Sequence, residues 1–215
     1  MKKLIIICEG QTEQAFCDKI LKSHFSTKEI EIEYPLILHS GGGIVPWRFL
    51  KQQIDLHIET EPSAYITTFI DYYGIYNHHV FPEWEKAHVE DEKAKRMAIL
   101  EAGMLDSLER NIQNQFIPNI QLHEFEALVL SDRDAFDRYY SQTEMNLEGL
   151  NALCALMPET INDGKETAPS KRLESFIPIY NKVSDGPELT QIIGLEKIRA
   201  QCPRFNNWIK NLEEI

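Results

Sequence analysis

Five acidic side chains follow directly on apolar stretches of this sequence. They are Glu9, Glu13, Asp71, Glu124 and Glu126. If the apolar stretches are parallel strands, their carboxyl ends meet at one edge of a sheet, and the five carboxylates lie together there. Two unit charges about 4 Å apart repel by roughly 4 kcal/mol at an effective dielectric constant near 20, so such a cluster requires a positive partner.

A divalent cation suits this cluster, because Mg²⁺ binds one or two carboxylates, keeps several waters and contacts substrate phosphate. The sequence therefore predicts a site for Mg²⁺ or Mn²⁺, and the predicted ligands are Glu9, Asp71, Glu124 and Glu126. Gly10 supports Glu9, since a glycine after a buried strand permits the sharp turn that presents the preceding side chain. The alternative is that these acids are solvated loop residues or charges at helix N-termini, where the helix dipole favours them.

Basic residues in the last third of the chain offer groups that bind phosphate. Lys165, Lys171 and Arg172 lie in the polar stretch 162–172. Lys171 and Arg172 begin an expected helix, so the backbone amides at its N-terminus add to their charge. The upstream glycine of a Walker A motif is missing before Gly164, so binding of ATP by a P-loop is not predicted. The alternative is a solvated loop that caps the helix.

Three side chains beside the acids have more than one interpretation. His123 is a metal ligand, a proton donor to a leaving group, or a histidine that fixes a loop through backbone hydrogen bonds, and the structural role is favoured. Tyr72 and Tyr73 either stack on exposed bases or pack their loop. The candidate catalytic residues are Glu9, Glu13, His123, Lys171 and Arg172. The candidate substrate-binding residues are Gly10, Tyr72, Tyr73, Lys165, Lys171 and Arg172.

Apolar runs separated by turn residues predict the sheet that positions these side chains. Strands are expected at Lys2–Cys8, Ile30–His39, Tyr65–Ile70 and Phe116–Leu122. Helices are expected over Gln14–Phe25 and from Pro46 to about Glu59. Two strand–helix–strand units of this length predict a parallel α/β sheet with right-handed crossovers. Pro118 predicts that the fourth strand lies at an edge or is irregular.

The rest of the chain is expected to be helical. A charged helical stretch spans Pro82–Asn111, and another helix covers His123–Leu130. Shorter helices are expected at Asp134–Tyr140, Leu147–Met157, Ser170–Ile177, Pro187–Ile193 and Pro203–Leu212. We therefore predict an α/β domain over residues 1–140 and a helical C-terminal extension over residues 141–215 that packs on the same domain.

Composition and charge limit the class of protein. The 215 residues suffice for one sizeable domain, and 43% hydrophobic with 26% charged residues is typical of a folded chain. No apolar run approaches the roughly 20 residues of a membrane span. Single cysteines without zinc-ligand spacing predict reduced thiols of a cytoplasmic protein. The net charge of −12 lies in residues 1–160, since residues 161–215 are neutral, and this argues against unaided binding of duplex DNA.

Several segments also resemble known families. Ile5–Gly10, a strand followed by Glu-Gly, and Phe69–Asp71, a strand ending in aspartate, resemble a Toprim domain. Toprim domains are the metal-dependent cores of topoisomerases, primases and nucleases of the overcoming-lysogenization-defect type. Six motifs more closely resemble the bacterial Toprim-like family catalogued as domain of unknown function 4276. They are EGQTE at Glu9–Glu13, FIDYYG at Phe69–Gly74, QLHEFEAL at Gln121–Leu128, PETINDG at Pro158–Gly164, TAPSKRL at Thr167–Leu173 and IGLEKIRAQCPRF at Ile193–Phe205.

The resemblance implies a Toprim-like, Rossmann-like parallel sheet flanked by helices. It implies that Glu9 is the Toprim glutamate, an acid/base or metal ligand, and that Asp71 is the first aspartate of the D-x-D metal pair. Tyr73 stands in place of the second aspartate, so Glu124 or Glu126 would have to supply that ligand. The family context also implies a partner ATPase of the AAA or ABC type, acting in trans in antiphage defence.

Three functions are compatible with these observations. The first is a Mg²⁺-dependent phosphodiester hydrolase that acts on DNA or RNA, with Lys171 or Arg172 offsetting transition-state charge. The second is a catalytically inactive, Toprim-derived effector or interaction subunit of an ATPase complex, which Tyr73 favours. The third is a phosphoryl-transfer enzyme for small nucleotides, which the acidic composition suits.

Overall fold

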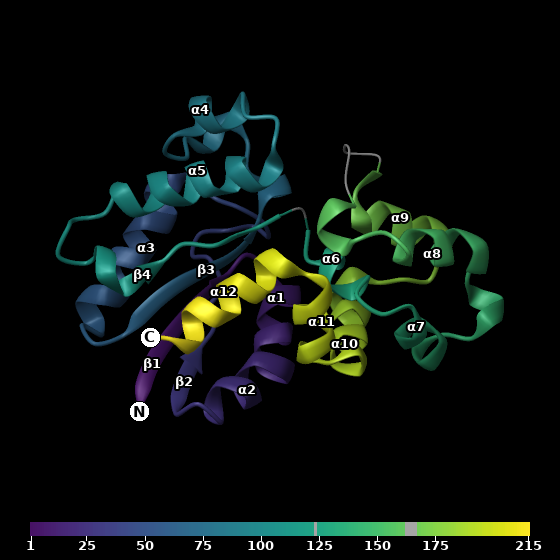
Figure 1. Cartoon of the computed structure of the whole chain (residues 1–215). Coiled ribbons are helices and arrows are strands. Elements are labelled where there is room, and N and C mark those ends of the chain that lie inside the picture. The colour runs from purple at the N-terminus through teal and green to yellow at the C-terminus, as the bar shows by residue number, and fades with distance from the viewer. Residues whose placement is uncertain (123, 162–166) are drawn as a thin grey trace.

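The computed structural model describes residues 1–122, 124–161 and 167–215. Among these residues, five parallel strands form one sheet (Figure 1). The strands are β1 (Lys2–Cys8), β2 (Ile30–Glu33), β3 (Tyr65–Asp71), β4 (Phe116–Ile117) and β5 (Ile120–Gln121). Their order is β2-β1-β3-β4, and β5 also pairs with β3. The predicted parallel α/β class is confirmed.

The central strand β1 is buried on both of its faces. Leu4, Ile6 and Cys8 belong to one cluster of buried side chains, and Ile5 and Ile7 belong to another. All five side chains are fully buried. Because successive side chains of a strand point to opposite faces, a continuous apolar run such as this one requires a covering layer on each side of the sheet.

Helices supply both layers (Figure 1). One face of the sheet is covered by α3 (Trp47–Thr60) and α5 (Lys93–Asp106), and α4 (Trp84–His88) packs against α5. The other face is covered by α1 (Gln11–Phe16), α2 (Lys22–Ser26), α10 (Lys182–Ile193), α11 (Leu195–Gln201) and α12 (Pro203–Glu213). A π-helical turn at Cys17–Leu21 joins α1 to α2.

Four short helices lie to one side of the sheet (Figure 1). They are α6 (Glu126–Val129), α7 (Arg133–Tyr139), α8 (Leu147–Cys154) and α9 (Pro169–Phe176). Single 3₁₀ turns occur at Tyr72–Gly74, Asn77–His79, Gln113–Gln115, Gln142–Glu144 and Pro158–Thr160. Leu150 of α8 and Leu173 of α9 belong to the same buried cluster as Leu4 of β1. The C-terminal helices therefore share a hydrophobic core with the sheet.

An aromatic cluster connects β3 to the helices around the sheet edge. The Phe16 ring lies 5.9 Å from Phe69, 5.6 Å from Phe125 and 5.9 Å from Phe205, measured between ring centroids, and each pair packs edge to face. Trp208 of α12 adds a polar anchor, since its Nε1–H donates to Thr67 Oγ1 of β3 (2.9 Å). Buried aromatic side chains in this geometry fix the relative positions of the elements that carry them.

The second strand is shorter than the predicted Ile30–His39. It ends at Glu33, and beyond it Leu36 forms an isolated bridge with Cys8. His39 adopts a φ of 60°, in the left-handed region. A residue in that conformation does not continue a strand, which is why the strand prediction over the last residues of this segment was wrong.

The predicted fourth strand, Phe116–Leu122, is divided into β4 and β5. Between them, Asn119 Nδ2 donates to the carbonyl oxygen of Thr68 (3.1 Å), and Asn119 N–H donates to Thr68 Oγ1 (3.1 Å). These bonds replace the regular ladder beside Pro118, which has no N–H to donate. Both halves still pair with β3.

Helix boundaries in the C-terminal third differ from the prediction at one important place. Helix α10 begins at Lys182, ahead of the predicted start at Pro187. Asn181 is the reason, because its Oδ1 accepts from the N–H groups of Val183 (3.0 Å) and Ser184 (3.1 Å) and caps the helix. Helix α11 (Leu195–Gln201) was not predicted.

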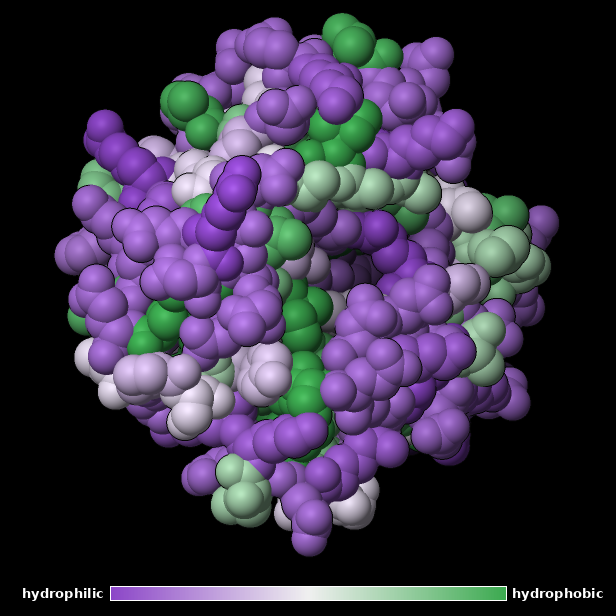
Figure 2. Space-filling model, turned by 60° about the vertical axis from the view of Figure 1, so that its left-hand side comes forward, coloured by the Kyte–Doolittle hydropathy of each residue, from purple (hydrophilic) through white to green (hydrophobic). Residues whose placement is uncertain are grey.

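The surface agrees with the acidic, polar composition. Figure 2 shows a face that is mostly hydrophilic, with hydrophobic side chains visible in a hollow near its middle and at scattered points elsewhere. Within the described residues, no helix combines the length and the apolar character needed to span a membrane.

Candidate functional site

The carboxyl ends of β1 and β3 bring Glu9 and Asp71 together. Cys8 pairs in register with Phe69, and Glu9 N–H donates to the carbonyl oxygen of Phe69 (3.0 Å). Asp71 N–H then donates to Glu9 Oε2 (2.7 Å). Two strands that are distant in sequence thus place two of the predicted metal ligands side by side.

Glu13 points back to the same strand end from the first turn of α1. Its Oε2 accepts from Gly10 N–H (2.9 Å), and the residue is only 3% exposed. A Cβ on Gly10 would lie 3.2 Å from this oxygen, so Gly10 permits the close contact. Gly10 itself is extended (φ −145°, ψ −175°), so the glycine is explained by the approach of the Glu13 carboxylate and not by a sharp turn.

The segment after β5 brings the last two acids to this edge. Phe125 N–H donates to Asp71 Oδ2 (3.3 Å), which ties the segment to β3. Glu126 is fully buried in α6. Glu124 is partly exposed, and its Oε2 accepts from the N–H (3.1 Å) and the hydroxyl (2.8 Å) of Ser170 at the start of α9. We refer to the five acids, Glu9, Glu13, Asp71, Glu124 and Glu126, as the carboxylate cluster.

Lys182, which the sequence analysis did not single out, lies within the carboxylate cluster. Its Nζ is 3.1 Å from Glu126 Oε2 and 3.9 Å from Asp71 Oδ2. The only local signal for this position is Asn181, whose capping of α10 sets Lys182 in the first turn. The positive partner that the clustered acids require is therefore present in the chain itself.

Burial and mutual repulsion shift the protonation of the cluster. Burial raises the pKa of Glu9 from 4.5 to about 7, against the hydrogen bond from Asp71 N–H. Burial likewise raises the pKa of Glu126 to about 7 and the pKa of Glu13 above its ordinary value. The pKa of Asp71 is raised well above 3.8 by burial and by its acidic neighbours. Burial lowers the pKa of Lys182, but the nearby carboxylates raise it by more, so the lysine is charged.

A cavity of about 580 Å³ opens beside the cluster. Its acidic and basic lining consists of Glu9, Glu13, Asp71 and Lys182. The segment Ser40–Gly43, between β2 and α3, also lines it. A cavity of this volume admits a ligand of small-molecule size, so the buried carboxylates have access to a substrate.

One carboxylate oxygen of the cluster, the buried Asp71 Oδ1, lacks a hydrogen-bond donor among the described residues. Glu126 Oε2 is also buried, and its cationic partner is Lys182 Nζ at 3.1 Å. The other Glu126 oxygen accepts from Tyr180 O–H (3.3 Å). Buried anionic oxygens without donors are costly unless a cation binds them. Carboxylate oxygens are also the ligands that hard divalent cations prefer.

The arrangement as it stands is not that of a loaded metal site. Across residues 1–122, 124–161 and 167–215, no three Asp, Glu, His or Cys side chains are grouped so as to hold a metal ion. Lys182 lies against Glu126 and Asp71 at the place where an ion would bind. Binding of a divalent cation here therefore requires the lysine ammonium to move.

The predicted basic residues Lys171 and Arg172 lie in the first turn of α9. Lys171 Nζ pairs with Glu174 (2.7 Å), and Arg172 Nε donates to the carbonyl oxygen of Thr167 (2.9 Å). The link from this helix to the carboxylate cluster is made by Ser170. The predicted residues His123 and Lys165 lie outside the residues that the structure describes.

The two tyrosines after Asp71 contact each other, and Tyr72 also contacts α5. Tyr72 O–H accepts from Arg96 Nη1 (2.9 Å), and the Arg96 guanidinium lies 5.7 Å from the centroid of the Tyr72 ring. The Tyr73 ring packs edge to face on Tyr72, with 6.2 Å between centroids. These contacts hold the Tyr72 side chain in place without a stacked nucleobase.

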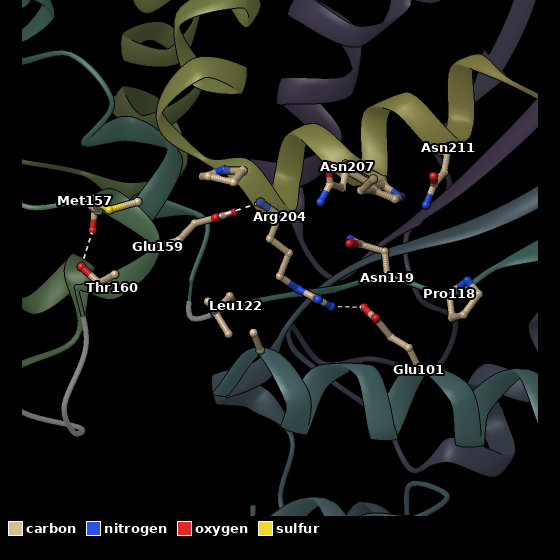
Figure 3. A pocket seen from close by; sticks show the side chains of 13 residues that line it. Glu101, Pro118, Asn119, Leu122, Met157, Glu159, Thr160, Arg204, Asn207 and Asn211 are labelled. Atoms are coloured by element: carbon tan, nitrogen blue, oxygen red, sulfur yellow. Dashed lines mark hydrogen bonds and ion pairs between the residues drawn. The ribbon is translucent and has the colours of Figure 1, made fainter. Parts of the chain in front are cut away.

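A second cavity, of about 430 Å³, lies between α5, α12 and the segment that joins β4 to β5 (Figure 3). Arg204 and Glu101 form an ion pair inside it. Glu159 accepts from the N–H groups of Arg204 and Phe205, each at 2.9 Å, and so caps α12. Because these charged groups bind one another and fix α12, we place the functional site at the carboxylate cluster.

Comparison with known proteins identifies a family. The model of the family described as Domain of unknown function (DUF4276) matches residues 8–213. This range includes every member of the carboxylate cluster and Lys182. No curated protein and no solved structure matches the chain.

Proposed function

The chain belongs to the DUF4276 family, and we propose that it is a divalent-metal-dependent phosphodiester hydrolase, a nuclease of Toprim type. One observation supports the proposal: five clustered acids, one of which (Asp71) has a buried oxygen without a hydrogen-bond donor, lie beside a cavity at the carboxyl edge of a parallel sheet. Chemistry in open parallel α/β sheets gathers at this edge. Phosphoryl transfer is the reaction class that combines clustered carboxylates, a divalent ion and a lysine.

Glu9 and Asp71 would hold the ion, and Glu126 or Glu124 would complete its protein ligands. Mg²⁺ or Mn²⁺, when bound, polarises the phosphate and lowers the pKa of a water. Glu9 Oε2 is committed to Asp71 N–H, so Oε1 is the oxygen that remains for the ion or for a water. Tyr73 at the second D-x-D position then has no consequence for metal binding, because α6 supplies the missing carboxylate.

The chain's own groups are suited to the proton and charge transfers of hydrolysis. A water oxygen bonds to phosphorus, the bond from phosphorus to the leaving oxygen breaks, and the proton lost by the water passes to a base. Glu13, which lines the cavity and is not among the proposed ligands, is suited to accept it. Lys182, which lines the cavity, offsets the negative charge that develops on phosphate oxygens.

The resemblance to Toprim nucleases supports nucleic acid, DNA or RNA, as the substrate. The net charge of −12 disfavours unaided binding of a long polyanion. A partner that delivers the nucleic acid fits this charge, and an AAA or ABC-type ATPase of a bacterial defence module is the partner that the resemblance suggests. Such a module would act in the cytoplasm.

A second candidate function is an interaction subunit that binds its partner without cleaving. The position of Lys182 favours it, because an ammonium group against Glu126 and Asp71 neutralises part of the cluster without any metal. On this alternative, the carboxylate cluster is a structural ion-pair network, and divalent cations have no effect on the protein.

A cleavage assay separates the two candidates. The purified protein is incubated with single-stranded DNA, duplex DNA and RNA in Mg²⁺ or Mn²⁺, with and without a candidate partner ATPase of the AAA or ABC type. We expect cleavage by the wild type, loss of cleavage in Glu9→Gln and Asp71→Asn, and no loss in Glu148→Gln, an exposed acid of α8. Full activity in both cluster variants would contradict the proposed site. A wild type that neither cleaves nor binds metal would support the interaction subunit.

A further inference from the structure

The segment Ser40–Gly43, which we call the glycine loop, lies beside the carboxylate cluster. Three consecutive glycines, Gly41, Gly42 and Gly43, line the same cavity as Glu9. Ser40 organises the loop, because its hydroxyl donates to the carbonyl oxygen of Gly43 (2.5 Å) and accepts from Gly42 N–H (3.0 Å). The loop thus has a defined conformation at the mouth of the site.

Backbone strain accounts for only part of this glycine content. Gly42 and Gly43 have φ values of 99° and 121°, which favour glycine. Gly41 has no such φ, and a Cβ on it would meet no atom within 4 Å. Neither conformation nor packing within the described residues requires glycine at position 41. Gly41 is exposed at the mouth of the cavity, where the lack of a side chain lets a ligand approach the backbone closely.

The glycine loop also has hydrogen-bond donors to offer. Among the described residues, the N–H groups of Gly41 and Gly43 have no acceptor. The loop adjoins Glu9, since a Cβ on Gly43 would lie 3.9 Å from Glu9 Oε1. Glu9 Oε1 is the oxygen left available by the bond between Oε2 and Asp71 N–H. Donors and an available carboxylate oxygen therefore meet at one wall of the cavity.

We propose that the glycine loop binds the phosphate of the substrate, with the amides of Gly41 and Gly43 donating to its non-bridging oxygens. The inference rests on the proposed function and identifies the substrate-binding wall of that site. A phosphodiester is repelled by Glu9, Glu13 and Asp71, so its phosphate needs donors that bring no negative charge. Backbone amides meet this need, and Lys182 adds positive charge on the same cavity lining.

Gly41→Val tests the proposal, because the added side chain enters open space and the fold should tolerate it. The probe is bis(4-nitrophenyl) phosphate, a small phosphodiester, with Mn²⁺ as the metal. We expect the KM of Gly41→Val to rise at least tenfold, with kcat and the affinity for Mn²⁺ within twofold of the wild type. Ser63→Val, which places the same side chain in an exposed turn before β3, should have no effect.

A second measurement keeps the test independent of turnover. Binding of the same probe is followed by calorimetry with Ca²⁺ in place of Mn²⁺, and Gly41→Val should weaken it at least tenfold. Hydrolysis by the wild type with equal KM in Gly41→Val would overturn the glycine-loop proposal and leave the proposed function intact. If the probe binds in a way that depends on Gly41 but is not hydrolysed, the proposed function would be overturned and the glycine-loop proposal would stand. Absence of both binding and hydrolysis would overturn both.

Discussion

Replacement of Lys182 by methionine removes the charge at the centre of the carboxylate cluster and keeps a side chain of similar length. The lost Nζ lies 3.1 Å from Glu126 Oε2 and 3.9 Å from Asp71 Oδ2. A charge pair about 4 Å apart is worth roughly 4 kcal/mol at an effective dielectric constant near 20. The Lys182 side chain is 37% exposed, so solvent screens part of this energy. We expect Lys182→Met to lower the free energy of unfolding by about 2 kcal/mol at pH 8.

The loss of stability in Lys182→Met should be smaller at lower pH, because protonation neutralises the carboxylates that the lysine charge stabilises. Burial raises the pKa of Glu9 and Glu126 to about 7, and removal of Lys182 raises both values further. At pH 5.5 these carboxylates are protonated with or without the lysine, so the loss should be less than about 1 kcal/mol. Mn²⁺ should stabilise Lys182→Met more than the wild type, since the ion no longer competes with an ammonium group.

Urea unfolding followed by circular dichroism at pH 5.5 and pH 8 measures both effects. Lys95→Met is the matched control, because Lys95 forms an exposed ion pair with Glu92 (2.7 Å) in α5, and exposed pairs contribute little to stability. Equal losses at the two pH values in Lys182→Met would refute the coupling between the lysine and the protonation of the cluster. Equal stabilisation of the variant and the wild type by Mn²⁺ would refute the proposed competition between the ion and the Lys182 ammonium group.

Three further predictions follow from the geometry of the site and its supports. Glu9 and Glu126 have a pKa of about 7 in the folded state and 4.5 in the unfolded state, so the folded state binds more protons. The free energy of unfolding of the metal-free protein should therefore fall between pH 5 and pH 8, by up to about 3 kcal/mol per group, as measured by urea titration. A constant free energy of unfolding over this range would contradict the prediction. Gly74→Ala places a Cβ 3.0 Å from Glu9 Oε1, so it should weaken Mn²⁺ binding several-fold, as measured by calorimetry. An unchanged affinity for Mn²⁺ would show that Oε1 is not a ligand. Glu159→Ala removes the cap of α12 and should cost about 1 kcal/mol in urea unfolding, whereas no cost would mean that α12 is held by its apolar contacts alone.

The strand ends of the site are predictable from the sequence. The runs of β1 and β3 are apolar along their whole length, which indicates strands covered on both faces of a parallel sheet. Parallel pairing then places the residues that follow each strand at one edge, and Glu9 and Asp71 meet there as expected. The acids near α6 reach this edge for the same reason, since β5 also pairs with β3.

Lys182 could not be predicted in the same way. It follows Asp71 by more than 100 residues in the sequence, and it reaches the cluster because α10 packs against α1 and α6. That packing depends on apolar side chains that are common to many helices. Pro187 also concealed the start of α10, because a proline usually marks a first turn, whereas here the cap is Asn181.

The glycine loop shows a second limit of sequence reasoning. Gly41, Gly42 and Gly43 were not among the site residues predicted from the sequence. The sequence cannot distinguish a glycine that a backbone conformation requires from one that leaves space for a ligand, because the difference lies in φ and in the neighbouring atoms. At Gly41 both are known, and neither demands glycine.

Anomalous scattering from crystals grown with millimolar Mn²⁺ at pH 8 tests the central claim most directly. The claim is that the carboxylate cluster binds a divalent cation in place of the Lys182 ammonium group. We expect an anomalous peak at the oxygens of Glu9 and Asp71, with Nζ of Lys182 moved away from Glu126. Crystals without such a peak, in which Lys182 Nζ still lies within ion-pair distance of Glu126 as it does here at 3.1 Å, would contradict the account.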